Sequence, residues 1–156
     1  MKKLVFIGLA LTVLLGISVI GCASQQSSNS NVRPLDGGQS SIGVEVSSDE
    51  LSNLKHITKQ VEITYPGSLI VTLGSNPTTG FQWSESAKLA DNTVMQQYEH
   101  NFLSPEATGV VGASGKDVWT FKSLKKGTTI ISFDYSRPWE GGEKGEWTVE
   151  LTVVVE

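Results

Sequence analysis

Residues 146–156 read EWTVELTVVVE, and the alternation within this stretch decides the fold class. Every second position carries a large apolar side chain: Trp147, Val149, Leu151 and Val153. A strand places such positions on one face, whereas a helix would not. The stretch DVWTFKSL at residues 117–124 alternates in the same way, with Trp119 and Phe121 together on one side. We therefore predict two strands with one buried face each, and Trp119, Phe121 and Trp147 in the core.

Similar short runs occupy the rest of the chain from Ile57 onward, divided by the turn sequences YPGS, NPTTG and KKGT. Seven strand-like segments in about 100 residues are typical of an antiparallel sandwich. The prediction is an all-β, immunoglobulin-like sandwich of seven antiparallel strands, with Trp83 of the third strand also in the core. The seven segments are 59–65, 68–74, 80–86, 93–102, 117–124, 128–136 and 146–156.

The stretch VSSDELSNLKHI precedes these runs and permits two interpretations. The spacing from Ser47 to Glu50 fits a capping box that begins one helical turn. An extended entry into the first strand fits equally well. We place the start of the folded domain at residue 44, with the domain continuing to residue 156.

The first residues have the order of an export signal. Lys2 and Lys3 precede an apolar run over residues 4–20, and small residues follow it. The alternative is a membrane-spanning helix, but the run is short for a bilayer core of about 30 Å and lacks a basic stop-transfer flank. We expect residues 1–21 to be a signal peptide that is removed. Residues 22–43, rich in Ser, Gln, Asn and Gly, are expected to be a flexible tether.

Cys22 is the single cysteine, and it follows Val19, Ile20 and Gly21 directly. This stretch resembles the bacterial lipobox, in which the cysteine is lipidated and becomes the mature N-terminus. The resemblance implies an exported lipoprotein, anchored in a membrane of the cell envelope by several acyl chains, palmitate among them. With one cysteine no disulfide forms within the chain, so the domain depends on its apolar core.

The charge and the scattered polar residues exclude several functions. Loss of Lys2 and Lys3 leaves 10 basic and 16 acidic residues, a net charge of −6 that disfavours nucleic acid as a partner. His56 and His100 lack a second ligand at metal spacing, so we predict surface residues, no metal and no cofactor. The acids of EGGEKGE, at residues 140–146, are expected to be solvated in a glycine-rich loop. No nucleophile with a base is visible, and we predict that the chain is not an enzyme.

The unusual residues of this sequence lie in three turns rather than in a catalytic group. In NPTTGF, Pro77 fixes its own φ and Gly80 permits a positive φ, so Thr78 and Thr79 stand on a stiff tip. In GVVGASGKD, three glycines, the first of them Gly109, let the backbone approach another surface closely. In SRPWEGGEKG, a tryptophan occupies a proline-stiffened loop, where it either binds a partner or folds back as a lid on the sandwich.

Together, NPTTGFQW (76–83), GVVGASGKDVWTF (109–121) and SRPWEGG (136–142) closely resemble the chagasin family of cysteine-protease inhibitors. The resemblance covers about residue 60 to the C-terminus. It implies an immunoglobulin-like fold and inhibition of papain-like cysteine peptidases by three loops at one end of the sandwich. The protease-binding residues that it implies are Asn76, Pro77, Thr78, Thr79 and Gly80; Gly112, Ala113, Ser114 and Gly115; and Arg137, Pro138 and Trp139.

Ser114 departs from the family pattern, which has glycine at this place in the middle loop. A side chain there would limit how closely the loop approaches a peptidase or would alter its φ. The topology of a seven-strand sandwich also predicts that the turns after the second, fourth and sixth strands share one end. We expect a monomer, and the competing interpretation is a surface-displayed immunoglobulin-like module for adhesion.

Overall fold

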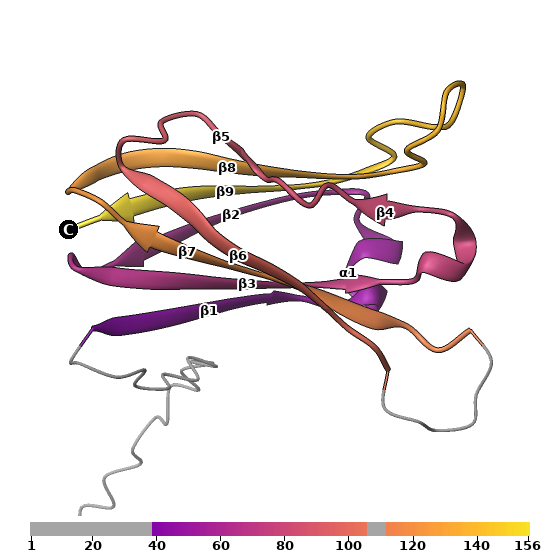
Figure 1. The fold of residues 1–156 in the computed structure, drawn as a ribbon, viewed down its shortest axis with the longest axis horizontal. Coiled ribbons are helices and arrows are strands. Elements are labelled where there is room, and N and C mark those ends of the chain that lie inside the picture. Colours follow the sequence, from indigo (N-terminus) through magenta and orange to yellow (C-terminus); the bar gives the residue numbers. More distant parts are fainter. Residues whose placement is uncertain (1–38, 106–111) are drawn as a thin grey trace, which may run out of the picture.

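The computed structural model describes residues 39–105 and 112–156, and over these ranges the chain forms two facing sheets (Figure 1). The four-stranded sheet has the order β1 (Ser40–Val46), β3 (Gly67–Ser75), β7 (Gly115–Ser123) and β6 (Met95–Leu103). The five-stranded sheet has the order β2 (His56–Ile63), β9 (Trp147–Val155), β8 (Gly127–Ser136) and β4 (Gln82–Trp83), and β5 (Lys88–Leu89) also pairs with β8. The predicted all-β sandwich is confirmed.

Two strand pairs differ from the antiparallel expectation. β1 pairs with β3 in parallel, and β2 pairs with β9 in parallel. For the first pair, the chain changes sheet twice: it leaves β1 for β2 in the facing sheet, then returns to β3 beside β1. β3 thus runs in the same direction as β1.

β1 also lies where the sequence suggested only a tether. It begins at Ser40, so residues 40–43 belong to the sheet and the folded domain starts before residue 44. The expected signal peptide, Cys22 and the rest of the tether lie outside the described residues. Within residues 39–105 and 112–156, no helix is long and apolar enough to cross a membrane.

A short helix, α1 (Ser48–Asn53), connects β1 to β2. The hydroxyl of Ser47 accepts a hydrogen bond from the Glu50 N–H at 3.1 Å, which is the N-cap that the Ser47 to Glu50 spacing allowed. The Glu50 carboxylate pairs with Lys59 at 2.9 Å. The helical alternative for this segment is therefore confirmed.

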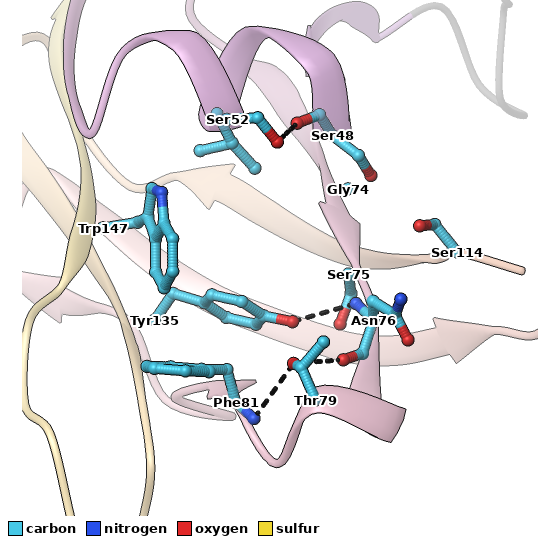
Figure 2. Close-up of a pocket in the computed structure, with 11 residues that line it drawn as sticks. Ser48, Ser52, Gly74, Ser75, Asn76, Thr79, Phe81, Ser114, Tyr135 and Trp147 are labelled. Carbon is cyan, nitrogen blue, oxygen red and sulfur yellow. Dashed lines mark hydrogen bonds between the residues drawn. The ribbon is translucent and has the colours of Figure 1, made fainter. Parts of the chain in front are cut away.

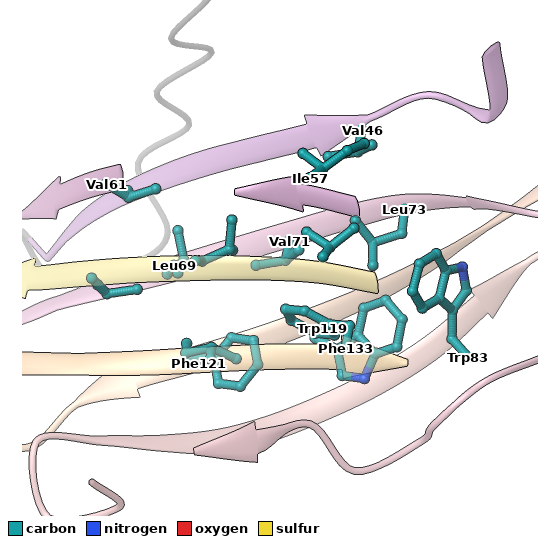
Figure 3. Packing of buried hydrophobic residues seen from close by; sticks show 14 of the residues in the cluster. Val46, Ile57, Val61, Leu69, Val71, Leu73, Trp83, Trp119, Phe121 and Phe133 are labelled. Carbon is teal, nitrogen blue, oxygen red and sulfur yellow. The ribbon is translucent and has the colours of Figure 1, made fainter. Parts of the chain in front are cut away.

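The core lies between the sheets and is centred on aromatic rings (Figure 3). Trp119 and Phe121 are fully buried, and Trp119 meets Phe133 at a centroid distance of 4.9 Å and Trp83 at 6.5 Å, both edge to face. Each buried indole N–H has a partner: that of Trp83 donates to the Gly74 carbonyl and that of Trp119 to the Glu85 carbonyl. The predicted core positions of Trp83, Trp119 and Phe121 are confirmed.

His100 was expected on the surface, and this prediction is wrong. Its ring stacks on Trp119 at 4.6 Å, and its Nε2 lies 2.7 Å from Asp117 Oδ1, with 17% of the side chain exposed. A bulge between Gln97 and Glu99 shifts the register of β6 and turns His100 towards the core. His56 is exposed, as expected.

Gly74 should be intolerant of a side chain, because α1 begins directly over it. A Cβ at this position would lie 2.4 Å from Ser48 Oγ and 2.5 Å from the Ser48 nitrogen. We expect Gly74→Ala to lower the free energy of unfolding by about 1–3 kcal/mol, as overpacking does. Gly43→Ala is the control, since a Cβ there has nothing within 4 Å. Thermal unfolding checks this, and equal melting temperatures for the two variants would contradict it.

Candidate functional site

The three unusual turns gather at one end of the sandwich, on the side where β3, β6 and β8 end (Figure 1). We call them the first loop (residues 76–80), the middle loop (104–114) and the third loop (137–146). Of the middle loop the structure describes residues 104–105 and 112–114, so Gly109 lies outside the described residues. The predicted clustering at one end is confirmed.

The first loop is organised by Asn76. Pro77–Thr79 form a single 3-10 turn, and the Asn76 side-chain oxygen accepts from the Thr78 N–H at 3.2 Å and from the Thr78 hydroxyl at 2.6 Å. The Thr79 hydroxyl donates to the Asn76 carbonyl at 2.7 Å. Gly80 ends the turn in the left-handed conformation with φ of 79°. The first loop thus forms a hydrogen-bonded turn, and the stiffness of its tip stays a prediction.

The hydroxyls of Thr78 and Thr79 are exposed, but they are not free to donate hydrogen bonds to a partner. Each hydroxyl carries one proton, and each donates that proton to Asn76 within the loop. The Thr79 oxygen also accepts from the Phe81 N–H at 3.4 Å, so one lone pair remains on Thr79 and two remain on Thr78. The exposed hydroxyls of Thr78 and Thr79 can therefore accept hydrogen bonds from a partner without disturbing the turn.

Asn76 also ties the first loop to its surroundings. Its backbone N–H donates to the Tyr135 hydroxyl at 2.9 Å (Figure 2). Its side-chain nitrogen donates to the Gly112 carbonyl in the middle loop at 3.2 Å. Tyr135 is buried and packs on Trp83 at a centroid distance of 4.7 Å. One asparagine therefore connects the first loop to the core and to the middle loop.

Gly80 and Trp139 bring the first and third loops into contact. A Cβ on Gly80 would lie 2.8 Å from the edge of the Trp139 ring, so only glycine allows this approach. Trp139 nevertheless remains 50% exposed. The ring stands beside the first loop with much of its surface in solvent, and this position favours the partner-binding interpretation over the buried lid.

Arg137 holds the third loop together. Its guanidinium lies 4.5 Å from the Phe81 ring centroid and 5.9 Å from that of Trp139, and it pairs with Glu143 at 3.0 Å. The Lys144 ammonium donates to the carbonyls of Arg137 and Trp139 at 2.5 and 3.0 Å. Pro138 and Trp139 are exposed next to these contacts of Arg137 and Lys144. The sequence placed Arg137 in the site but did not indicate its stacking on Phe81.

Two acids of the third loop form ion pairs with basic side chains. Glu143 is exposed and pairs with Arg137, while Glu146 pairs with Lys55. Within the described parts of the chain, no group of three or more His, Cys, Asp and Glu residues is arranged to hold a metal ion. The geometry supports stabilisation of the loop by these carboxylates.

The middle loop accommodates its serine without backbone strain. Gly112 has φ of 81°, whereas none of the described residues other than glycine, Ser114 included, has a positive φ. Ala113 is half-buried and Ser114 exposed. Gly115 is buried, and a Cβ there would lie 2.6 Å from the Phe102 ring. Ser114 thus adopts a φ that any residue can take, and both effects expected of its side chain stay predictions.

Sequence reasoning missed two supporting residues and misplaced one. Tyr135 and Phe81 stack at 5.6 Å beneath the loops and hold Asn76 and Arg137, and their alternation in strands indicated burial only. Trp147 was expected in the core, but it is half-buried at the first position of β9 and packs edge-on against Phe81 at 4.9 Å. It lies where the sheet ends, and the Lys55 ammonium lies over its ring at 5.8 Å from the centroid.

Comparisons with known proteins agree with this geometry. A family model described as "Chagasin family peptidase inhibitor I42" matches residues 64–153. Amoebiasin-2 of Entamoeba histolytica is 29% identical over 100 residues, which cover 61% of this chain and 76% of the relative. Chagasin of Trypanosoma cruzi is 33% identical over 78 residues, which cover 48% of this chain and 70% of chagasin.

Solved structures show the same fold. The cysteine protease inhibitor EhICP2 from Entamoeba histolytica aligns with a TM-score of 0.57 and 24% identity, over 73% of this chain and 96% of that one. PbICP-C, solved in complex with falcipain-2, aligns with a TM-score of 0.52 and 16% identity, over 76% of this chain and 100% of that one. With a family model matching more than half of its length, this chain belongs to the chagasin family of peptidase inhibitors.

Proposed function

We propose that this protein is a reversible, tight-binding and non-covalent inhibitor of papain-like cysteine peptidases. The observation that carries the proposal is the joining of three loops into one edge. Asn76 bonds to the middle loop at Gly112, and Gly80 packs under Trp139 of the third loop. Such an edge is shaped to enter a cleft. Family membership supports the same function.

The first loop would enter the catalytic centre between the other two. Thr78 and Thr79 present oxygen acceptors to the donors of a Cys and His pair, while their own protons hold the turn. Because the turn is already ordered, little conformational entropy is lost on binding. No extended peptide bond is offered for cleavage, since residues 77–79 form a 3-10 turn. The protein thus inhibits without turnover.

The outer loops would flank the cleft. Trp139 offers an exposed ring that Arg137 and Gly80 hold in place. Gly112, Ala113 and Ser114 would cover the opposite side, and the buried Gly115 would support them from the start of β7. A three-loop footprint of this kind buries on the order of 1,600 Å², the usual size for protease and inhibitor pairs. A monomer suffices for this function, and the complex of PbICP-C with falcipain-2 supports the class of partner.

Trp139→Ala should weaken inhibition sharply. The exposed ring is a hot spot in this account, so we expect a loss of about 2 kcal/mol or more, which is about 30-fold in Kd. The melting temperature should change little, because half of the ring is already in solvent. Titration of papain with a fluorogenic substrate measures the first effect and thermal unfolding the second.

Tyr98→Ala provides the matched control, since Tyr98 is 64% exposed and lies on β6 away from the three loops. Its inhibition constant should equal that of the unmodified chain. A lower melting temperature with unchanged inhibition in the Trp139 variant would support the lid instead. Binding to papain without inhibition would favour an adhesion module.

Gly80→Ala should damage the site in two ways. It places a side chain at φ of 79°, which costs about 1–2 kcal/mol, and it drives a methyl group into Trp139. Gly145→Ala tests the first effect alone, since Gly145 has φ of 61° and nothing within 4 Å of its Cβ position. We expect Gly80→Ala to lose at least as much stability as Gly145→Ala, and to lose papain inhibition by about tenfold or more beyond any loss in Gly145→Ala. Equal inhibition by both variants would remove the Gly80 contact from the mechanism.

We further propose that the protein is exported and held at the cell envelope by a lipid on Cys22. The lipobox-like stretch before Cys22 and the Ser-rich segment after it support this location. The tether would then hold the three loops, which together we call the inhibitory edge, away from the membrane.

Cys22→Ser tests the anchor directly. Expressed in a bacterial host, the unmodified chain should incorporate labelled palmitate and partition into detergent, because several acyl chains bind a membrane stably. The variant should lose the label. Palmitate labelling that persists in the variant would contradict the proposal.

A further inference from the structure

A pocket of about 330 Å³ lies beside the inhibitory edge, between α1 and the bases of the first and middle loops (Figure 2). Ser48, Leu51 and Ser52 of α1 form one wall. Phe81, Tyr135 and Trp147 form the wall facing them. The half-buried Trp147 thus lines the pocket as well as packing against the core.

The lining determines what the pocket can receive. Its walls are largely apolar, and the polar side-chain groups among its lining residues are serine and threonine hydroxyls, the Tyr135 hydroxyl, the Trp147 indole N–H and the Asn76 amide. None of the described residues that line it is Asp, Glu, Lys, Arg or His. Several of the polar groups are already engaged: the Tyr135 hydroxyl accepts from the Asn76 N–H, the Thr79 hydroxyl donates to the Asn76 carbonyl, and the Ser52 hydroxyl donates to the Ser48 carbonyl. A charged group would lose its hydration there without a partner. An uncharged, apolar side chain fits this lining.

The α1 wall lies outside the segment that the family model matches, which begins at residue 64. Its position is fixed by the glycine at residue 74, where a Cβ would collide with Ser48. The cap at Ser47 and the Lys59 pair with Glu50 hold the helix from its other sides. The segment before residue 64 thus supplies one wall of the pocket, and its contacts hold that wall in place.

The pocket is continuous with the inhibitory edge. Asn76 and Thr79 of the first loop and Ser114 of the middle loop are among its lining residues. A partner that engages both loops therefore also meets residues of the pocket. The volume is at the lower end of the range of about 300–1,000 Å³ for ligand pockets, which suits one or two side chains.

We propose that this pocket receives an apolar side chain from the surface of the bound peptidase and forms a fourth contact beside the three loops. The inference rests on the proposed function. Ser114 lies at the junction of the middle loop and this pocket, so its hydroxyl borders the entering side chain. The fourth contact then adds selectivity among peptidases that share a catalytic centre.

Filling the pocket from α1 tests this inference. Ser52 lines the pocket and its hydroxyl donates to the Ser48 carbonyl at 2.8 Å, whereas Asn53 does not line it and its side chain donates to the Asp49 carbonyl at 2.9 Å. Both residues are exposed. Ser52→Trp and Asn53→Trp therefore remove the same kind of bond and add the same ring to the same helix, but only the first blocks the pocket.

The full chain and both variants would be titrated against papain. We expect Ser52→Trp to raise the inhibition constant by about tenfold or more, and Asn53→Trp to leave it within about twofold. Ser52→Leu should give an intermediate loss, and it serves as the readout if the tryptophan variant has a lowered melting temperature. The pocket contact would be overturned if the Ser52 variants inhibited papain as well as the unmodified chain does. It would also be overturned if Asn53→Trp lost as much inhibition as Ser52→Trp. Neither result would contradict the proposed function. Failure of the unmodified chain to inhibit papain would overturn the proposed function and this inference with it.

Discussion

The geometry of the site depends on the hydrogen bonds of Asn76. Its side-chain oxygen holds Thr78, its carbonyl holds Thr79, and its side-chain nitrogen reaches the middle loop at Gly112. Its backbone N–H ends on Tyr135, which is packed among the aromatic rings of the core. These hydrogen bonds order the first loop by attaching it to the core of the sandwich. A partner therefore meets a surface that is already ordered.

The third loop has a separate support. Arg137 stacks on Phe81 and pairs with Glu143, while Lys144 binds two carbonyls of the same loop. These contacts hold the Trp139 ring beside Gly80 without burying it. α1 contributes on the other side of the first loop, where it converts the open end of the sandwich into a pocket. Local turns and a distant N-terminal segment thus combine into one continuous surface.

Sequence patterns predicted much of this arrangement. Alternation identified β7 and β9 with their buried residues, because one face of each strand must meet the core. Proline and glycine in NPTTG indicated the stiff tip. The parallel pairing of β1 escaped prediction, because its short run SSIGVEV resembles a polar linker and its direction depends on two sheet crossings. The burial of His100 was hidden by a bulge, and the contact of Asn76 with Tyr135 joins residues 59 positions apart.

The central claim is that the three loops at one end contact the peptidase. Hydrogen exchange of the backbone amides, measured on the full chain with and without papain, tests it most directly. The account predicts slower exchange in the complex at the first loop, at residues 112–115 and at the third loop, with no change at the turn of residues 124–126 at the opposite end. Protection at residues 124–126 or along the β6 edge, with the three loops unchanged, would contradict it.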